Sequence, residues 1–331
     1  MLPTKRKQLI ISGNSALVIK NTEMPEPASH EVLIKVTAAG VNRGDILQRR
    51  GLYKAPDNAS AVPGLEVSGK IVKAGIDVTS VKVGDTVCAL TEGNGYSDYA
   101  LSHEDYCFQT GKLDLQQMAA FPEALFTIWH NIFQRCGLTR EENILIHGGS
   151  NGIGVIAIQL CALLGARVFC TAGSEEKRAL CQKLGAEKAF DYHLPSFFEE
   201  LSHIPSLKHG KNGMDVILDI AGGDFIERNF IAAAEEARIC LIALIRGHKT
   251  TVSFAPVMTK RLTITGSTLR PLSQLQKSAI SEDIRERVWP EILAGKIKPV
   301  IDSVFPFSEA DLAHQRMESG LHSGKILLLP D

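Results

Sequence analysis

Residues 143–177 have the sequence NILIHGGSNGIGVIAIQLCALLGARVFCTAGSEEK, which predicts a strand, a tight turn, a helix and a second strand. The apolar run 144–146 is typical of a strand buried on both faces, and residues 152–165 are long and regular enough for the helix. Between them lies GGSNGIG, residues 148–154. Glycines there allow a sharp turn and the close approach of a pyrophosphate to free N–H groups at the helix start. The stretch therefore predicts a dinucleotide site.

Glycine clusters also occur in turns for purely conformational reasons, so the cluster alone is weak evidence. Its context strengthens the interpretation, because the motif requires a preceding strand and a following helix, and both are predicted here. Nucleotide binding is therefore favoured over a merely structural turn.

The composition is that of a globular protein with room for two domains, since the chain has 331 residues and 44% of them are hydrophobic. Its 36 basic and 37 acidic residues give a net charge of −1, so no general attraction to nucleic acid or to an anionic membrane is expected. The longest apolar run, residues 153–166, is interrupted by Gln159 and is shorter than a bilayer span. The first residues do not resemble a secretory signal.

Seven cysteines are scattered along the chain without C-x-x-C spacing. An odd, scattered set predicts reduced thiols rather than a disulfide framework. We therefore expect a soluble cytoplasmic protein whose partners must be inferred from its binding sites.

The order of elements predicts two kinds of domain. Residues 1–110 combine β-branched runs with glycine and proline turns, which is typical of a small β-rich domain. Residues 115–135 predict helix, interrupted at Pro122, and after Gly266 we expect a helix at 280–294 and a tail that rejoins the first domain. Between these segments strands alternate with helices, which predicts a doubly wound parallel sheet with strands at 144–146, 167–171, 188–192, 215–220, 237–244 and 262–265.

Several motifs in a consistent order carry a family likeness over essentially the whole chain. They are AGVNRGDILQRRGLY at 39–53, VPGLEVSGKIV at 62–72, VGDTV at 83–87, HGGSNGIG at 147–154, TAGSEEK at 171–177, GSTLR at 266–270 and GKI at 324–326. With them the chain resembles the zinc-free quinone oxidoreductases of the medium-chain dehydrogenase/reductase superfamily, which are related to zeta-crystallin.

The resemblance implies an α/β protein with two domains. A GroES-like β-rich domain would comprise residues 1–123 and 267–331, and a Rossmann domain with a six-stranded parallel sheet would comprise residues 124–266. The nicotinamide and the substrate would bind in the cleft between them. The zinc-dependent branch has a cysteine where this chain has Asn42 and Gly-His-Glu where it has Gly64-Leu65-Glu66, and no four-cysteine cluster is present. The sequence therefore predicts no metal.

The glycine turn also fits a rival family, because Asn151 replaces the second glycine of G-x-G-x-x-G and the spacing resembles that of short-chain dehydrogenases. Those enzymes would bring a Tyr-x-x-x-Lys pair, and no tyrosine here has a lysine four residues on. The turn also begins only at residue 148, far from the start where short-chain enzymes have it. The rival is disfavoured.

The end of the second strand predicts NADPH rather than NADH. An NAD-preferring site has an acidic residue about 20 residues after the turn, whereas this strand ends Thr171-Ala-Gly-Ser. A small, uncharged corner leaves room for a 2′-phosphate, which Lys177 could neutralise and Tyr192 could hydrogen-bond. The structural alternative is a solvated lysine and a strand-end tyrosine, and Glu175 and Glu176 count against the phosphate.

Hydride transfer to a quinone needs no protein nucleophile, because the cofactor carries the chemistry while the protein orients the ring and hydrogen-bonds the oxygen that gains charge. The candidate catalytic residues are Asn42, Asp45 and Tyr53. Asn42 suits the nicotinamide ribose or a substrate carbonyl, and Tyr53 suits stacking on a planar substrate. A surface turn in which Asp45 caps a helix at 46–50 is the structural alternative, with equal weight for Asp45.

The resemblance implies further residues around the cofactor. Thr127 matches a position near the nicotinamide amide, and His130 lies one turn further on, although a packed histidine is the alternative there. A plain interdomain salt bridge is the alternative for Arg270, and His147 is expected to be structural. The predicted cofactor-binding residues are Asn42, Thr127, His130, Ser150, Asn151, Gly152, Ile153, Gly173, Ser174, Lys177, Tyr192, Ile220, Leu244, Arg246, Arg270 and Lys325.

The leading functional hypothesis is an NADPH-dependent reductase of quinones. Reduction of an activated double bond in an enone or alkenal is the first alternative, since it needs the same hydride geometry plus a proton donor. A nucleotide-binding structural or RNA-associated protein is the second, and the near-neutral charge counts against nucleic acid. Residues 250–266 predict an edge strand that pairs across a two-fold axis, as the family's dimers suggest, in a homodimer or homotetramer.

Overall fold

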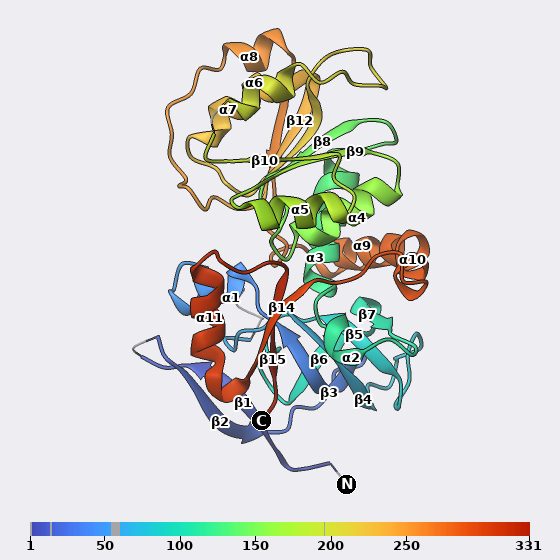
Figure 1. The fold of residues 1–331 in the computed structure, drawn as a ribbon. Helices are drawn as coiled ribbons and strands as arrows, with labels where there is room; N and C mark the ends of the chain where they lie inside the picture. The colour runs from blue at the N-terminus through green and yellow to red at the C-terminus, as the bar shows by residue number, and fades with distance from the viewer. Residues whose placement is uncertain (1, 14, 54–59, 195) are drawn as a thin grey trace. The chain divides into compact units, whose positions relative to one another are not determined.

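The computed structural model describes residues 2–13, 15–53, 60–194 and 196–331. They form two compact units, and most of their helices and strands are labelled in Figure 1. The first unit is Met1–Phe126 with Arg270–Asp331, and the second unit is Thr127–Leu269. Among the described residues, the structure contains no helix that is long and apolar enough to cross a membrane.

The first unit is built on a seven-stranded sheet in the order β14-β15-β3-β4-β5-β7, with β6 also paired to β3. Most residues of β3 are buried, which explains its almost continuous apolar sequence. The predicted β-rich architecture is confirmed. The bounds of the strands are β3 Glu31–Gly40, β4 Glu66–Ala74, β5 Thr86–Leu90, β6 Tyr99–His103, β7 Cys107–Gln109, β14 Ile301–Pro306 and β15 Lys325–Leu329, and a separate antiparallel pair is formed by β1 Lys5–Ile11 and β2 Leu17–Glu23.

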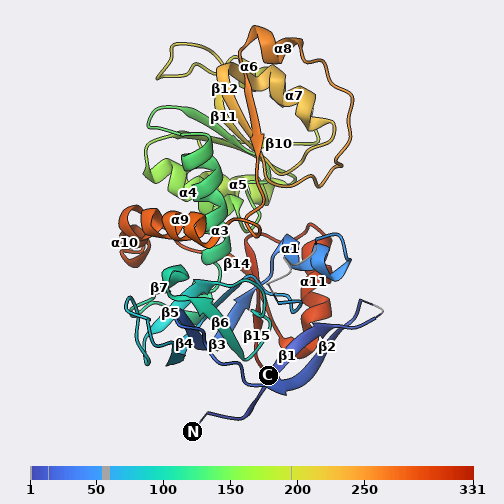
Figure 2. The same ribbon diagram turned by 180° about the vertical axis from the view of Figure 1, so that it is seen from behind.

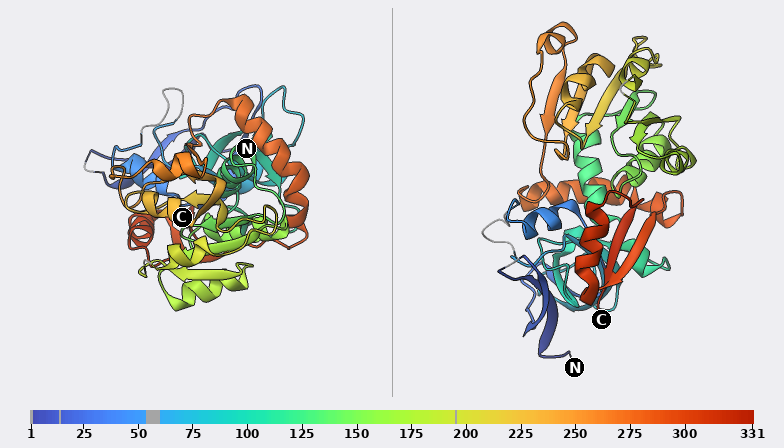
Figure 3. Two further views of the ribbon diagram at one scale, coloured as in Figure 1. Left: turned by 90° about the horizontal axis from the view of Figure 1, so that it is seen from above. Right: turned by 60° about the vertical axis from the view of Figure 1, so that its left-hand side comes forward.

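The C-terminal strand β15 lies between β14 and β3 in this sheet. β15 pairs antiparallel with β3, so that Leu327 is opposite Gly40 and Leu328 is opposite Ala39. The helix α11, Ala310–Glu318, lies beside β14 and β15 (Figure 3) and buries Ala310 and Ala313 in the same core as Leu328. The end of the chain therefore lies directly beside the residues that precede Asn42.

The helix expected at residues 280–294 is in fact two helices, α9 Gln274–Arg287 and α10 Trp289–Leu293. The break falls where Pro290 lacks the N–H that a continuous helix would need. The other helical segments of the first unit are α1 Arg43–Arg49 and α2 Leu115–Met118, with 3₁₀ turns at Glu104–Tyr106 and Phe307–Glu309, and α3 Pro122–Ile128 runs across the boundary between the units.

The second unit has a six-stranded sheet in the order β10-β9-β8-β11-β12-β13, in which every neighbouring pair is parallel. This confirms the predicted doubly wound sheet. The strand order reverses between β8 and β11, and in such sheets ligands bind at the carboxyl ends of the strands near that point. The strands are β8 Asn143–Ile146, β9 Arg167–Ala172, β10 Lys188–Asp191, β11 Met214–Asp219, β12 Ala233–Leu241 and β13 Thr263–Gly266.

Helices cover both faces of this sheet, as Figures 1 and 2 show from opposite sides. On one face α6 and α7 bury Phe197, Phe198, Phe225 and Phe230 against the core of β8, β11 and β12. The glycine turn leads into α4, which packs on β8 and β9. The helices are α4 Gly154–Leu163, α5 Glu175–Lys183, α6 Phe197–Ser202, α7 Phe225–Ala232 and α8 Ala255–Thr259.

The helix predicted at residues 115–135 ends in a π-helical segment, Trp129–Arg135. Asn131 is buried in this segment, where its Nδ2 donates to Thr127 O at 2.8 Å. Its Oδ1 accepts from Ser267 Oγ at 2.8 Å and from Cys240 Sγ at 3.1 Å. The wider helical turn is therefore held in place by side chains that are distant in the sequence, which the helix pattern alone does not show.

Candidate dinucleotide and substrate sites

The glycine turn after β8 has the tight geometry that its sequence predicts. Gly148 has φ of +72°, a conformation that favours glycine. A Cβ at Gly154 would lie 2.4 Å from Gly148 O and 2.6 Å from Gly149 O, so the start of α4 packs directly on the turn. A Cβ at Gly149 would lie 2.7 Å from Cys170 Sγ and 3.0 Å from Cys181 Sγ. No larger residue fits these positions without movement of the turn.

Asn151 stabilises the turn from inside. Its Oδ1 accepts hydrogen bonds from Ile153 N at 2.9 Å and from Gly154 N at 2.8 Å. Two N–H groups at the helix start, where a phosphate was predicted to bind, are thus already hydrogen-bonded to a side chain. Within the described part of the chain the structure records no acceptor for the amide N–H of Ser150 or Gly152, and these groups could hold the negative charge of a cofactor.

A second group of predicted residues meets at the end of β9. Ser174 caps α5, with its Oγ accepting from Lys177 N at 3.3 Å. A Cβ at Gly173 would lie 2.5 Å from the Tyr192 hydroxyl, so the phenol lies directly beside that glycine. Arg246 is bound to Asp224 through Nε at 2.7 Å, and Asp224, followed by Tyr192, raises the pKa of Arg246. The acidic side chains at this corner are Asp224, which is paired with Arg246, and Glu175 and Glu176 in the first turn of α5.

Two apolar residues predicted to line the site lie at the same end of the sheet. Ile220 Cδ1 is 2.5 Å from the place that a Cβ of Gly148 would take, and Leu244 Cδ2 is 2.7 Å from that of Gly222. Thr127 and His130 belong to this unit as well, and both are buried. His130 Nδ1 contacts Gln134 Oε1 at 3.1 Å, whereas among the described residues its buried Nε2 has no partner.

In the first unit, Asn42 belongs to a buried triad with Glu66 and Lys325. Asn42 Nδ2 donates to Glu66 Oε1 at 2.8 Å, and Lys325 Nζ donates to Asn42 Oδ1 at 2.7 Å and forms an ion pair with Glu66 Oε1. Glu66 Oε2 accepts from Glu123 N at 2.9 Å. A Cβ at Gly40 would lie 2.1 Å from Glu66 Oε1, so only glycine admits the carboxylate here. Asn42 and Lys325 are among the site residues predicted from the sequence, whereas Glu66 is not.

This triad does not fit a zinc ion. A zinc site of the related enzymes would use side chains at positions 42, 65 and 66, and here Asn42 and Leu65 offer no thiolate or imidazole. The one carboxylate, Glu66, is already paired with the Lys325 ammonium. The positive charge at this place is therefore supplied by the chain itself.

Asp45 holds two turns of the first unit together. It is fully buried, its Oδ2 accepts from Asn42 N at 2.8 Å, and its Oδ1 accepts from Gly64 N at 2.8 Å. Tyr96 donates to Oδ2 at 3.2 Å. Burial raises the pKa of Asp45 to about 6. The helix predicted from residue 46 therefore begins at Arg43, because Asp45 already bonds the backbone at its first turn.

Tyr53 and Arg270, which were predicted separately as a catalytic and a cofactor-binding residue, lie side by side. The Arg270 guanidinium lies 5.9 Å from the centre of the Tyr53 ring, and burial raises the pKa of Tyr53. Arg270 is 5% exposed, and it donates to Gln48 Oε1 at 2.6 Å and to the carbonyl of Ser60 at 3.1 Å. These are neutral partners, so the guanidinium charge is not cancelled by them.

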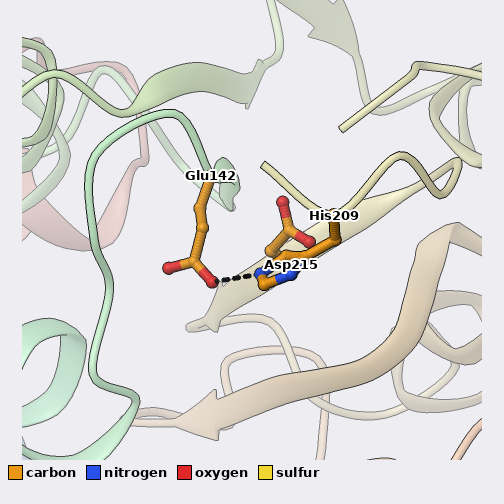
Figure 4. Close-up of side chains that lie close together, drawn as sticks. All are labelled: Glu142, His209 and Asp215. Carbon is orange, nitrogen blue, oxygen red and sulfur yellow. Dashed lines mark hydrogen bonds and ion pairs between the residues drawn. The ribbon is translucent and has the colours of Figure 1, made fainter. Parts of the chain in front are cut away.

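One other cluster has ligand chemistry, at the opposite end of the second unit's sheet. Among the described residues, Glu142, His209 and Asp215 are the one group of three metal-ligating side chains with atoms within 4.8 Å of one another (Figure 4). Glu142 accepts from Arg238 through both oxygens at 3.0 Å, and Asp215 Oδ2 accepts from Asn143 N at 2.7 Å. Because a guanidinium and amides already bind the carboxylates, the cluster is structural.

Comparisons with known proteins agree with a β-rich first unit and a dinucleotide-binding second unit. Residues 28–132 match the alcohol dehydrogenase GroES-like domain, and residues 152–286 match the zinc-binding dehydrogenase family. The chain is 30% identical over 313 residues to a quinone oxidoreductase of Lama guanicoe, with 92% of this chain and 91% of the relative covered.

Solved structures share the fold over almost the full length. An NAD-dependent alcohol dehydrogenase superimposes with a TM-score of 0.83 at 26% identity, covering 98% of this chain and 99% of the other. The quinone oxidoreductase of Coxiella burnetii superimposes with a TM-score of 0.77 at 25% identity, covering 98% of each chain. The chain belongs to the medium-chain dehydrogenase/reductase superfamily, within its quinone oxidoreductase family, and is an oxidoreductase that uses a nicotinamide dinucleotide.

Proposed function

We propose that the protein is a zinc-independent NADPH:quinone oxidoreductase. The observation that carries the proposal is the Lys325, Glu66 and Asn42 triad, because it puts an ammonium and an amide where zinc-dependent relatives have metal ligands. The bound cofactor would supply a hydride, and solvent would supply the proton that completes the hydroquinone. A quinone needs neither Lewis acid nor nucleophile from the protein, which suits this set of side chains.

The cofactor preference is supported by the corner at the end of β9. Gly173 and Ser174 leave it without a carboxylate for a ribose 2′-hydroxyl, while Tyr192 and Lys177 offer a hydroxyl and a charge for a 2′-phosphate. Ser150 and Gly152 amides would bind the pyrophosphate. On the substrate side, Asn42 and Tyr53 are proposed to orient the acceptor and hydrogen-bond its oxygen, and Asp45 is proposed to position Asn42. Arg270, beside Tyr53, is proposed to contact the cofactor.

The cofactor proposal is tested with Lys177→Ala. We expect NADPH to bind about 10-fold more weakly, with NADH binding unchanged, since one charge–phosphate interaction is lost. Lys183→Ala is the matched control, because Lys183 is an exposed lysine in the last turn of the same helix. An unchanged ratio of the two affinities in Lys177→Ala would remove the assignment.

The acceptor is tested by following NADPH oxidation with a series of quinones, enones and alkenals and by identifying the products. Hydroquinone formation at the highest kcat/KM supports the proposal. Saturated ketones or aldehydes as the dominant products would show a double-bond reductase instead. NADPH binding with no acceptor effect, together with tight RNA binding, would favour the nucleotide-binding alternative.

We further propose a homodimer or homotetramer in the cytoplasm. β13 is an edge strand of its sheet, and next to it in the sequence Phe254 and Met258 are 66% and 76% exposed, which suits pairing with a second copy. The cysteines are free and buried, as expected of a reducing compartment. A monomer in sedimentation equilibrium at micromolar concentration would contradict the assembly.

A further inference from the structure

A chain of hydrogen bonds runs through the interior of the second unit at the carboxyl ends of its strands. Its four side chains are Thr171 of β9, His147 directly after β8, Asn229 of α7 and Asp219 at the end of β11. All four are buried, with at most 2% exposure. His147 was expected to be structural, and neither Asn229 nor Asp219 is among the residues predicted from the sequence.

The contacts fix the direction of every hydrogen bond. Asp219 Oδ2 accepts from Asn229 Nδ2 at 2.8 Å, so Asn229 turns its Oδ1 toward His147 Nε2, also at 2.8 Å. His147 must therefore carry its proton on Nε2, and its Nδ1 accepts from Thr171 Oγ1 at 3.3 Å. Burial lowers the pKa of His147, which keeps the imidazole neutral at physiological pH.

Both ends of the chain finish on backbone N–H groups of turns. At one end Thr171 Oγ1 accepts from Gly148 N at 3.1 Å, and Gly148 opens the glycine turn. At the other end Asp219 Oδ1 accepts from Ala221 N at 2.6 Å and Gly222 N at 3.0 Å. These turns follow β8 and β11, the two strands between which the strand order reverses.

The imidazole is buried among aromatic rings between the two turns. The rings of Phe197, Phe198 and Phe225 surround it, with centroid distances of 6.4, 6.0 and 5.1 Å. Apolar walls exclude water that could replace a lost hydrogen bond, so removal of one member leaves its neighbours unsatisfied. The four hydrogen-bonded side chains therefore set the distance between the two turns, and each hydrogen bond has a defined donor and acceptor.

We propose that His147 is a positioning residue for the dinucleotide. Through Thr171 and Asn229 it fixes the glycine turn relative to the turn at Ala221 and Gly222, and this sets the affinity for the cofactor as well as the stability of the unit. The inference rests on dinucleotide binding alone, and it does not depend on the acceptor or on a preference for NADPH.

The test compares His147→Phe with His147→Gln. Phenylalanine keeps the ring and removes both hydrogen bonds, whereas the glutamine amide can still donate to Asn229. We expect Kd for both NADPH and NADH to rise about 10-fold in His147→Phe and to recover to within about 3-fold of wild type in His147→Gln. Binding is measured by titration calorimetry without an acceptor, and unfolding is followed by thermal denaturation.

Ser206→Ala is the matched control. Ser206 is equally buried in the same unit, where its Oγ donates to Asp215 Oδ2 at 2.9 Å at the opposite end of the sheet. It should lower Tm without changing either Kd. Unchanged Kd values in His147→Phe, with a lower Tm only, would show a merely structural histidine and overturn the proposal.

A second pair of variants serves if His147→Phe does not fold. Thr171→Val removes the hydroxyl that joins His147 to Gly148, and Thr171→Ser keeps it, so weaker binding only in the valine variant is expected. Equal affinities in the two variants would contradict the inference. Normal dinucleotide binding by the wild type without quinone turnover would refute the proposed function and leave this inference intact.

Discussion

The two ends of the parallel sheet in the second unit are both closed by buried polar residues, yet the residues at each end differ in charge. At the amino ends, Glu142 is bound by the Arg238 guanidinium, and Asp215 is bound by a backbone amide and a serine. At the carboxyl ends, the neutral side chains of His147 and Asn229 connect two turns, and Asp219 receives only amide groups.

The difference lies in how many donors reach each acceptor. Around Glu142 an arginine, a histidine and the Thr139 amide surround one carboxylate, so no ligand is needed to neutralise it. At the carboxyl ends, the amide N–H groups of Ser150 and Gly152 have no hydrogen-bond acceptor among the residues that the structure describes. A cluster of metal-ligating side chains, such as the one in Figure 4, is thus a poorer guide to a binding site than backbone N–H groups without an acceptor are.

The largest effect should come from Gly154→Ala at the carboxyl end. The new Cβ would lie 2.4 Å from Gly148 O, and a backbone carbonyl cannot move aside without displacing the turn. We expect dinucleotide Kd to rise about 100-fold. Gly137→Ala is the control, because this glycine has open space around it, and its φ of +58° should cost only about 1 kcal/mol of stability. Similar binding by both variants would break the contrast between the ends.

Glu142→Gln should destabilise the amino end and leave binding intact. Burial alone would raise the pKa of Glu142, but Arg238, Thr139 and His209 hold it at about 2, so the ionised form is strongly bound. Replacing it should cost about 2–3 kcal/mol in urea unfolding, since Arg238 loses its bidentate partner.

Glu235→Gln is the matched control for that variant. Glu235 pairs with Lys211 and Arg261 on the surface, and its loss should not shift the urea midpoint measurably. A change in dinucleotide Kd caused by Glu142→Gln would show that the two ends are coupled.

The smallest effect should appear on mild acidification. His147 has a lowered pKa, so its stabilising neutral form is fully present above the ordinary value of 6.5 and is lost as the pH falls toward its folded pKa. The contribution of Glu142 persists above 4.5 and is lost only as the pH falls toward about 2. Between pH 7 and pH 5 the Tm of wild type should therefore fall more steeply than that of His147→Gln, whereas Glu142→Gln should keep the wild-type slope. Parallel slopes in wild type and His147→Gln would contradict this.

The sequence predicted the parallel sheet well because each strand is a local apolar run whose neighbours follow from the alternation with helices. It placed helix ends less well: α1 begins at Arg43 because the Asp45 carboxylate bonds the Asn42 amide. The roles of Asn42, Tyr53 and Lys177 stay predictions, because these roles are defined by contacts with a cofactor or a substrate.

The polar contacts between segments far apart in the sequence could not be predicted. His147 and Asn229 are 82 residues apart, and Asn42 and Lys325 are 283 apart. Pairing over such separations depends on which strand neighbours which, so no local pattern reveals it. Asn151 shows the same limit at short range. The glycine turn predicted that the N–H groups at the helix start bind a phosphate, whereas the Asn151 side chain accepts hydrogen bonds from two of them.

Lys325 has a consequence for how this active site can evolve. Restoring a cysteine at position 42 and a histidine at position 65 would leave its ammonium against Glu66, where it would repel a divalent ion. A zinc ion at positions 42, 65 and 66 would therefore also require a change at Lys325 in β15, which is remote from them in the sequence. Replacement of Lys325 alone would leave the buried Glu66 carboxylate without its partner, whereas changes at positions 42 and 65 would leave this ion pair in place, so the order of the replacements decides their cost.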